Sequence, residues 1–462
     1  MREACGVFGI YSFKDDSPFR DVYYGLFALQ HRGQESAGIA VSNLEDVKVQ
    51  KGMGLVNQVF NEQSINQLHG KIAIGHVRYS TTGSSNIENA QPILINSKYG
   101  PVALAHNGNL INTEDLRCEL KERGLSFIGT SDSELIAALI STSDKSDIES
   151  AIIDMLNKIK GAYSLVILTK DSLIALRDPN GIRPLSIGKT ENAYVFSSET
   201  CGFDIIGAHF IRDINNGELV IIKDNEMRSR IFSNDSREAL CIFEFIYFAR
   251  PDSIIHGRSL YESRVNMGKY LAKEHPVRAD LVIPVPESGI PAAIGYADES
   301  GIPYGEGLIK NRYVGRTFIE PNQEMRSLGV RIKLNPIQDA VRGKKVIVVD
   351  DSIVRGTTSR QIVKLLKEAG ASEVHMRVSS PKILNPCYYG IDTATRAELI
   401  AANLSLEGIA KYLDVDSLGY LSLNNLVKAV ALPEKRFCLA CFNDDYPVKV
   451  PEKMQSLKLF FK

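Results

Sequence analysis

The chain has 462 residues, of which 44% are hydrophobic and 24% are charged, and its 54 basic residues nearly balance its 55 acidic ones. This length predicts about two to four domains with substantial apolar cores. The near-zero net charge gives no indication of a nucleic-acid or membrane partner, and no apolar run approaches the roughly 18 residues that span a bilayer. Since Glu3 and Lys14 stand where a signal peptide would be apolar, we expect a cytoplasmic protein.

Up to about residue 230, short apolar strands alternate with turns that are rich in Gly, Asn and Ser. The strand-like stretches are 5–12, 71–83, 101–109, 162–169 and 193–199. Helical periodicity is confined to a few segments such as SELIAALI at 133–140. This half is therefore predicted to be β-rich with packed helices, and the polar stretch 231–239 is predicted to end it.

After this boundary, strands, loops and helices follow one another in a repeated order. Residues 279–301 form a predicted βα unit and residues 344–380 a βαβ unit, which indicate a parallel sheet. From about residue 395 the pattern favours amphipathic helices, including LEGIAKYL at 406–413 and LNNLVKAV at 423–430, before a CLAC element at 438–441.

A predicted phosphate site follows the buried strand Val346–Val349, which ends in Asp350 and Asp351. The next residues supply backbone and side-chain donors at the start of a helix: Arg355, Gly356, Thr357, Thr358 and Ser359. A helix N-terminus binds phosphate, and strand-end carboxylates can accept ribose hydroxyls or hold Mg²⁺. Taken in parts, the same residues could be an acidic strand end and a helix cap.

The whole string VVDDSIVRGTTSR at 348–360 resembles the phosphoribosyl-pyrophosphate loop of type I phosphoribosyltransferases. A second strand, at 281–286, runs into Ser288 and Gly289 and could receive pyrophosphate there, although such a turn is a weak signal alone. Six basic residues between the two loops suggest a lid over departing pyrophosphate, or else a solvated loop: Lys310, Arg312, Arg316, Arg326, Arg331 and Lys333.

A cysteine at position 5, before the apolar run GVFGI, would ordinarily be a buried strand residue. Four further strings occur in order at 25–38, 75–83, 105–110 and 129–134. Together they resemble the glutaminase domain of N-terminal-nucleophile amidotransferases, which implies an α+β fold with an αββα sandwich over residues 5–230.

This resemblance implies that Cys5 is the nucleophile and that its α-amine, exposed by removal of a propeptide at 1–4, is the general base. It also implies that Arg78 binds the α-carboxylate of glutamine and Asp132 its α-ammonium. Asn107 and Gly108 would form the oxyanion hole, although NG alone is more typical of a hairpin turn. The histidines His31, His76 and His106 are expected to be structural, because the amine already supplies the base.

Seven cysteines are too few for a disulfide scaffold, so each is a core residue, a nucleophile or a metal ligand. The strings around Cys241, Cys387, Cys438 and Cys441 resemble those of amidotransferases that carry a [4Fe–4S] cluster with a structural role. A zinc site or four unlinked thiols remain alternatives. Cys118 and Cys201 have no counterpart in this pattern and are expected to pack in the core.

Both halves in this order resemble the glutamine phosphoribosylpyrophosphate amidotransferases, with an α/β type I phosphoribosyltransferase domain at 231–462. The resemblance implies glutamine and phosphoribosyl pyrophosphate as substrates, Mg²⁺ held by Ser288, Asp350 and Asp351, and Lys310 with the 355–359 loop on the substrate. It further implies inhibition by purine nucleotides and a homo-oligomer, expected to be a tetramer. Alternatives are an amidotransferase with another acceptor, and a regulator that binds phosphoribosyl pyrophosphate without reacting.

Overall fold

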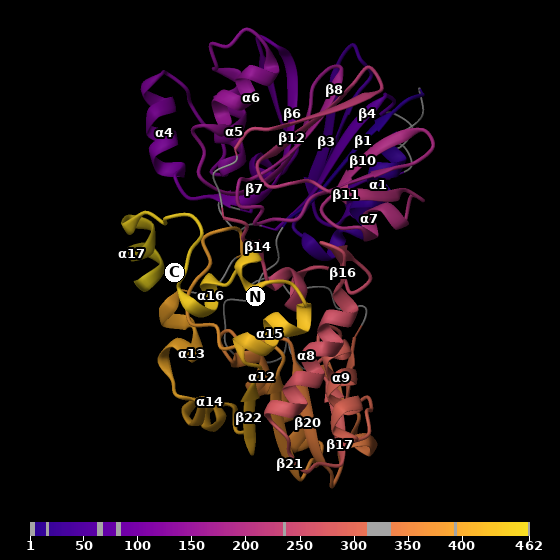
Figure 1. The fold of residues 1–462 in the computed structure, drawn as a ribbon, viewed down its shortest axis with the longest axis vertical. Helices are drawn as coiled ribbons and strands as arrows, with labels where there is room; N and C mark the ends of the chain where they lie inside the picture. The colour runs from indigo at the N-terminus through magenta and orange to yellow at the C-terminus, as the bar shows by residue number, and fades with distance from the viewer. Residues whose placement is uncertain are drawn as a thin grey trace.

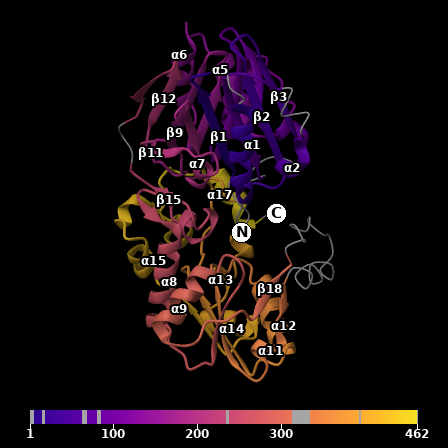
Figure 2. The ribbon, with the colours of Figure 1, turned by 90° about the vertical axis from the view of Figure 1, so that its right-hand side faces the viewer.

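The structure is a computed structural model that describes residues 5–14, 18–61, 68–79, 85–233, 237–311, 334–391 and 395–460. Figure 1 shows the first half of the chain stacked on the second along the long axis of the molecule. The C-terminal helices α16 (Ala440–Asn443) and α17 (Glu452–Phe460) lie at the level of the junction between the halves (Figures 1 and 2). No helix in these described ranges is long and apolar enough to cross a membrane.

The first half contains two antiparallel sheets. The seven-stranded sheet has the order β11-β9-β10-β1-β4-β2-β3, with β1 (Gly6–Ser12), β2 (Ser36–Ser42), β3 (Val47–Met53), β4 (Ile72–Arg78), β9 (Ser186–Lys189), β10 (Ala193–Ser197) and β11 (His209–Asp213). The six-stranded sheet has the order β13-β12-β8-β7-β6-β5, with β5 (Ile93–Ser97), β6 (Gly100–Leu110), β7 (Gly161–Leu168), β8 (Ser172–Arg177), β12 (Glu218–Lys223) and β13 (Glu226–Ile231).

The two sheets pack face to face with helices outside them. On β1, Val7 and Tyr11 point into the core between the sheets, whereas Phe8 and Ile10 point to the core under α1. A strand with both faces buried reads as a continuous apolar run, as this one does. Helices α1 (Pro18–Ala28), α2 (Val56–Val59) and α7 (Cys201–Asp204) cover one sheet, and α4 (Thr113–Glu122), α5 (Asp132–Ser141) and α6 (Ile148–Leu156) cover the other. The predicted αββα sandwich is confirmed.

The second half is built on a parallel sheet of order β17-β20-β21-β22: β17 (Leu281–Pro284), β20 (Lys345–Asp350), β21 (Glu373–Val378) and β22 (Ser417–Tyr420). Val346 and Val348 of β20 pack against α12 (Thr357–Glu368) and α14 (Leu406–Leu413). Ile347 and Val349 face α8 (Leu260–Glu274), α9 (Ile290–Ser300) and α15 (Leu423–Val430). Helices on both faces make this an α/β domain, as predicted.

Short elements complete the chain. They are η1 (Gln30–Arg32), η2 (Ile87–Asn89), β14 (Leu240–Cys241), the π-helix η3 (Glu244–Phe248), β15 (Ile254–Ile255), β16 (Arg258–Ser259), β18 (Leu308–Lys310), β19 (Leu334–Pro336), α11 (Gln338–Val341), η4 (Arg396–Glu398), α13 (Ile400–Asn403), η5 (Glu434–Arg436) and β23 (Phe437–Cys438). β14 pairs in parallel with β23, so the segment after the first half joins the C-terminal segment. The division at 230/231 stays a prediction; β13 itself ends at Ile231.

Candidate active sites

Cys5 stands directly before β1. Its side chain is buried, and its Sγ lies 3.5 Å from the carbonyl oxygen of Tyr79, beyond the end of β4. Its own carbonyl oxygen accepts a hydrogen bond of 3.0 Å from Nε of Arg32. β1 and β4 are paired in register, Gly6 opposite Val77, which explains why the two strand ends meet here.

Charged groups of opposite sign surround this thiol. Burial raises the pKa of the Cys5 thiol, the charges of Arg78 and Arg32 lower it, and the carboxylate of Asp132 raises it. Arg78 is the last residue of β4, and its Nη1 lies 3.3 Å from Oε1 of Glu35. Asp132 is the first residue of α5 and accepts a hydrogen bond from the backbone N–H of Leu110. The structure therefore brings together the three residues that the sequence predicted for glutamine, a ligand with one carboxylate and one ammonium.

Asn107 and Gly108 lie within β6, paired with Ser164 and Tyr163 of β7, so the hairpin-turn alternative is wrong. The Asn107 side chain is fully buried, and neither its Nδ2 nor its Oδ1 has a hydrogen-bond partner among the described residues. Gly108 has a φ of +152°, and a Cβ there would collide with the carbonyl oxygen of Ala162. An unpaired buried amide costs free energy, so it is the kind of group that a ligand is expected to satisfy.

The three histidines of the motifs all have protein partners. His76 Nε2 lies 3.0 Å from the carbonyl oxygen of His106, and His106 Nδ1 lies 3.1 Å from the hydroxyl of Ser133. Burial lowers the pKa of His76 to about 3, so it is neutral at physiological pH. His31 Nε2 lies 2.8 Å from Glu199.

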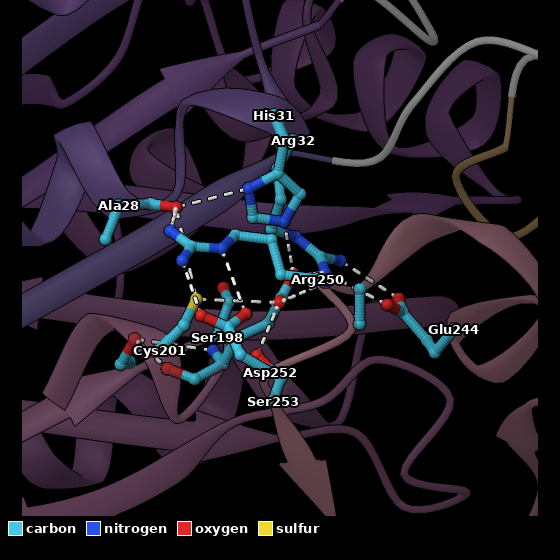
Figure 3. Close-up of polar contacts among 12 residues, drawn as sticks. Ala28, His31, Arg32, Ser198, Cys201, Glu244, Arg250, Asp252 and Ser253 are labelled. Carbon is cyan, nitrogen blue, oxygen red and sulfur yellow. Dashed lines mark hydrogen bonds and ion pairs between the residues drawn. The ribbon is translucent and has the colours of Figure 1, made fainter. Parts of the chain in front are cut away.

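A buried charge network beside Cys5 was missed by the sequence analysis (Figure 3). Arg32 makes contacts of 2.5 Å to Glu199 and 2.9 Å to each carboxylate oxygen of Glu244, and all three side chains have zero exposure. Glu199 also accepts hydrogen bonds of 2.8 Å from the backbone of Arg250 and the hydroxyl of Ser253. These partners are far apart in the chain, and no local pattern connects them.

The predicted phosphate loop forms a pocket of about 250 Å³ where β20 meets α12. Gly356 caps α12 with a φ of +75°, a left-handed conformation that favours glycine. The lining contains all but one of the predicted residues of this site: Ser288, Asp350, Asp351, Arg355, Gly356, Thr357, Thr358 and Ser359. It also contains Tyr247, which follows Cys241 in the chain and for which the sequence predicted no role.

Two buried carboxylates make the floor of this pocket suitable for a cation. Burial, together with the charge of Asp351, raises the pKa of Asp350 well above its ordinary value. Burial also raises the pKa of Asp351, against a hydrogen bond from Ser288 that lowers it. A dication would favour both carboxylates in their charged form, so these residues fit a magnesium ion.

Lys310 is the exception. It ends β18 outside the pocket lining, is exposed, and lies 3.4 Å from a carboxylate oxygen of Glu287. The other basic residues of the predicted lid fall at 312–333 and lie outside the described residues.

The four predicted cluster cysteines gather at the junction of the two halves. Cys241 stands opposite Cys438 in the β14–β23 pair, and the carbonyl oxygen of Cys441 accepts hydrogen bonds from the backbone of Leu384 and Asn385, next to Cys387. Burial raises the pKa of Cys441 well above its ordinary value, and the charges of Cys438, Cys241 and Cys387 raise it further. The prediction that Cys118 packs in the core is wrong, because it lies on the exposed face of α4, whereas Cys201 is buried beside Glu199 as predicted.

The surroundings of these thiols fit an iron–sulfur cluster. The backbone N–H of Tyr389 donates to Sγ of Cys387 at 3.3 Å. Burial raises the pKa of Cys241 to about 12, against the charge of Arg183, which lowers it. Hydrogen bonds to sulfur and buried thiolates are features that stabilise and tune such clusters. Within the described ranges, no three His, Cys, Asp or Glu groups are close enough to hold one metal ion, whereas a cluster binds each thiolate through a different iron.

Comparison with known proteins agrees with the two predicted kinds of domain. Residues 76–204 match the glutamine amidotransferase domain family, and residues 254–383 match the phosphoribosyl transferase domain family. The amidophosphoribosyltransferase of Synechococcus elongatus is 53% identical, over 100% of this chain and 94% of that protein. That of Methanocaldococcus jannaschii is 52% identical, over 96% of this chain and 98% of that protein.

Two solved structures are similar over almost the whole chain. The allosteric regulatory enzyme of purine biosynthesis has a TM-score of 0.92 at 48% identity, with 97% of each chain covered. The glutamine phosphoribosylpyrophosphate amidotransferase of B. subtilis, complexed with ADP and GMP, has a TM-score of 0.91 at 48% identity, covering 97% of this chain and 98% of that one.

Proposed function

Since the chain belongs to the amidophosphoribosyltransferase family, we propose that Cys5 and the β20–α12 pocket divide its reaction between them. The reaction hydrolyses glutamine and transfers the ammonia to C1 of phosphoribosyl pyrophosphate. Its products are 5-phosphoribosylamine, pyrophosphate and glutamate, and it is the first committed step of purine biosynthesis. Identity of about half over the full chain favours this reaction over the alternatives of another acceptor and of a regulator without activity.

The glutaminase step takes place at Cys5. The α-amine of Cys5, freed by removal of residues 1–4, takes the thiol proton, and the thiolate attacks the amide carbon of glutamine. Arg78 binds the α-carboxylate and Asp132 the α-ammonium. The Asn107 amide and the Gly108 N–H stabilise the oxyanion, ammonia leaves, and water releases glutamate from the thioester.

The buried amide of Asn107, without a partner among the described residues, is the observation that carries this assignment. It lies one residue from a glycine whose Cβ has no room, within a fold that puts opposite charges around a buried thiol. A structural asparagine would have been paired on folding, because leaving both amide atoms unpaired costs about 1–3 kcal/mol.

The transferase step takes place in the β20–α12 pocket. The N-terminus of α12 and the 355–359 loop bind the 5-phosphate, and Asp350 and Asp351 face the ribose side. These carboxylates and Ser288 would hold Mg²⁺, which would neutralise charge on the pyrophosphate as it departs. Ammonia arriving from the first half attacks C1, and pyrophosphate leaves.

Four thiolates, those of Cys241, Cys387, Cys438 and Cys441, would hold a [4Fe–4S] cluster with a structural role. The cluster would tie the end of the first half to the C-terminal helices, since two of the ligands lie on the paired strands β14 and β23. Support comes from the gathering of the four thiols and from the N–H donor on Cys387.

We further infer binding of purine nucleotides as feedback inhibitors, because the B. subtilis relative was solved with ADP and GMP. A homo-oligomer, a tetramer by family resemblance, and a cytoplasmic location complete the proposal. The location fits an enzyme of purine biosynthesis with reduced thiols.

Substitution Cys5→Ala tests the division of labour. The variant is expected to lose glutamine-dependent synthesis and to keep ammonia-dependent synthesis, because only the first step needs the thiol. Both are measured as pyrophosphate release with saturating phosphoribosyl pyrophosphate and Mg²⁺. Glutamine use that survives in this variant, or active protein whose intact mass retains residues 1–4, would refute the role of Cys5.

A further inference from the structure

The network around Arg32 joins the two halves of the molecule at the nucleophile. Glu244, the first residue of the π-helix η3, belongs to the segment after the first half and is completely buried. Its two carboxylate oxygens each accept a 2.9 Å hydrogen bond from a different terminal nitrogen of Arg32. Such a two-point contact fixes the plane of a guanidinium as well as its position.

The third nitrogen of the same guanidinium acts on Cys5. Nε of Arg32 donates to the carbonyl oxygen of Cys5 at 3.0 Å, and this bond is buried. The carbonyl group, the α-amine and the thiol side chain of Cys5 are all joined to the same Cα. Fixing the guanidinium therefore fixes where the base and the nucleophile of the glutaminase step stand.

The other end of η3 reaches the second site. Tyr247, three residues after Glu244, lines the phosphate pocket. Arg264 of α8 stabilises this segment, since it donates hydrogen bonds to the carbonyl oxygens of Phe245 at 2.8 Å and Ala249 at 2.6 Å. One short, tightly bonded segment thus contacts both the support of Cys5 and the wall of the transferase pocket.

We propose that Glu244 is a positioning residue for the glutaminase reaction, supplied by the transferase side of the molecule and acting on Cys5 through Arg32. The proposal rests on the role of Cys5 proposed above. A small displacement of a reacting group strongly lowers the reaction rate. Loss of the contact between Glu244 and Arg32 should therefore lower kcat more than it weakens glutamine binding.

Glu244→Gln is the direct test. It keeps the size of the side chain but removes the charge that pairs with both terminal nitrogens of Arg32, of which only one also contacts Glu199. We expect kcat for glutamine-dependent synthesis to fall at least about tenfold. The KM for glutamine and the ammonia-dependent rate should both stay within about twofold, because neither depends on the placement of the Cys5 backbone.

The matched control is Glu218→Gln. Glu218 is 2% exposed and pairs with both terminal nitrogens of Arg212 at 2.7 and 2.8 Å, without contact to Cys5. Both variants should lower the thermal midpoint, but only Glu244→Gln should lower glutamine-dependent kcat. If Glu244→Gln does not fold, Arg32→Lys takes its place, since it keeps the charge for Glu244 but lacks the planar fork, and the same selective loss is expected.

Three outcomes decide the matter. A selective fall of glutamine-dependent kcat supports the proposal. An unchanged kcat, or an equal fall of the ammonia-dependent rate, overturns it. Cys5→Ala, measured in parallel, separates the two levels: if that variant still uses glutamine, the proposed function fails, whereas if only the Glu244 variant behaves as the parent protein, the positioning role fails.

Discussion

At the scale of single residues, Asn107 shows a conflict between stability and function. Its amide is fully buried with no partner among the described residues, while Asn109, two positions along β6, donates to the carbonyl oxygen of Tyr388 at 2.8 Å. Two asparagines on one strand thus have opposite energetic roles. One is held in an unfavourable environment, as groups at functional sites often are, and the other stabilises the contact between the halves.

We predict that Asn107→Ala lowers glutamine-dependent kcat by about 100- to 1,000-fold, as loss of an oxyanion donor does elsewhere, with little change in ammonia-dependent synthesis. The same change should leave the free energy of unfolding equal or raise it, because it removes two unpaired polar atoms. Asn109→Ala should instead lower it by about 1–2 kcal/mol. Denaturant titration of both variants measures this contrast, and a destabilised Asn107→Ala would show that the amide is structurally paired.

His76 gives a pH dependence. Burial, reinforced by the nearby charge of Arg78, lowers the pKa of His76 to about 3 from an ordinary 6.5. Between these values the unfolded chain binds a proton at this residue and the folded chain does not. The contribution to stability is therefore complete above pH 6.5 and is lost as the pH falls toward 3.

We expect the free energy of unfolding to fall by about 1.4 kcal/mol per pH unit within that window because of this one residue. Urea unfolding at about pH 7, above the window, and at about pH 5.5 and 4.5, within it, on the parent protein and on His76→Gln, would measure this loss. The variant should show the shallower decline. Equal slopes for the two proteins would contradict a neutral, buried His76.

At the scale of elements, the N-terminus of α12 depends on one glycine. Gly356 and Gly343 both have left-handed backbones, with φ of +75° and +69°. A Cβ on Gly356 would come within 2.8 Å of Ile400 Cδ1, whereas a Cβ on Gly343 would meet nothing within 4 Å. The two positions therefore share the backbone penalty but differ in crowding at the phosphate loop.

We predict that Gly356→Ala and Gly343→Ala each lower the free energy of unfolding by about 1–2 kcal/mol, the ordinary cost of this conformation for a residue with a Cβ. Only Gly356→Ala should raise the KM for phosphoribosyl pyrophosphate, by about tenfold or more, because either the phosphate loop or the Ile400 side chain packed against it must shift to make room for the added methyl. Steady-state kinetics with ammonia as the second substrate isolates this effect. Equal KM values for the two variants would argue against the loop as the phosphate site.

At the scale of the whole molecule, the cysteine group lies where the halves meet. A pair of two-residue strands such as β14 and β23 is too short to be stable alone. Arg183 of the first half adds hydrogen bonds of 3.0 and 2.7 Å to the carbonyl oxygen of Tyr389, beside Cys387. A cluster at this place would hold three segments of the chain in one position.

We predict that protein purified without oxygen contains about four irons and four sulfides per chain and is brown, as the proposed [4Fe–4S] cluster requires. Cys438→Ser should lose the iron and the colour and should have a lower thermal midpoint. The control Cys201→Ser, which changes a buried thiol outside the group, should keep both. Iron-free, colourless parent protein would refute the cluster.

Features that depend on neighbouring residues in the chain could be predicted from the amino-acid sequence alone. Alternating and continuous apolar runs predicted the strands of both halves, and the contiguous string 348–360 contained most of the phosphate pocket. A loop between a strand and a helix is built from consecutive residues, so its chemistry can be recognised from consecutive letters. Cys5, Arg78 and Asp132 are not consecutive, so their common site was predicted only from the family resemblance.

The contacts between residues far apart in the chain became known only from the fold. It placed Asn107 and Gly108 in a strand where their dipeptide alone is typical of a turn, and left Lys310 outside the pocket. It also joined Arg32 to Glu244 across 212 positions of sequence and so connected the halves at the nucleophile. Such contacts follow from the burial of apolar faces between layers, which no local pattern of residues specifies.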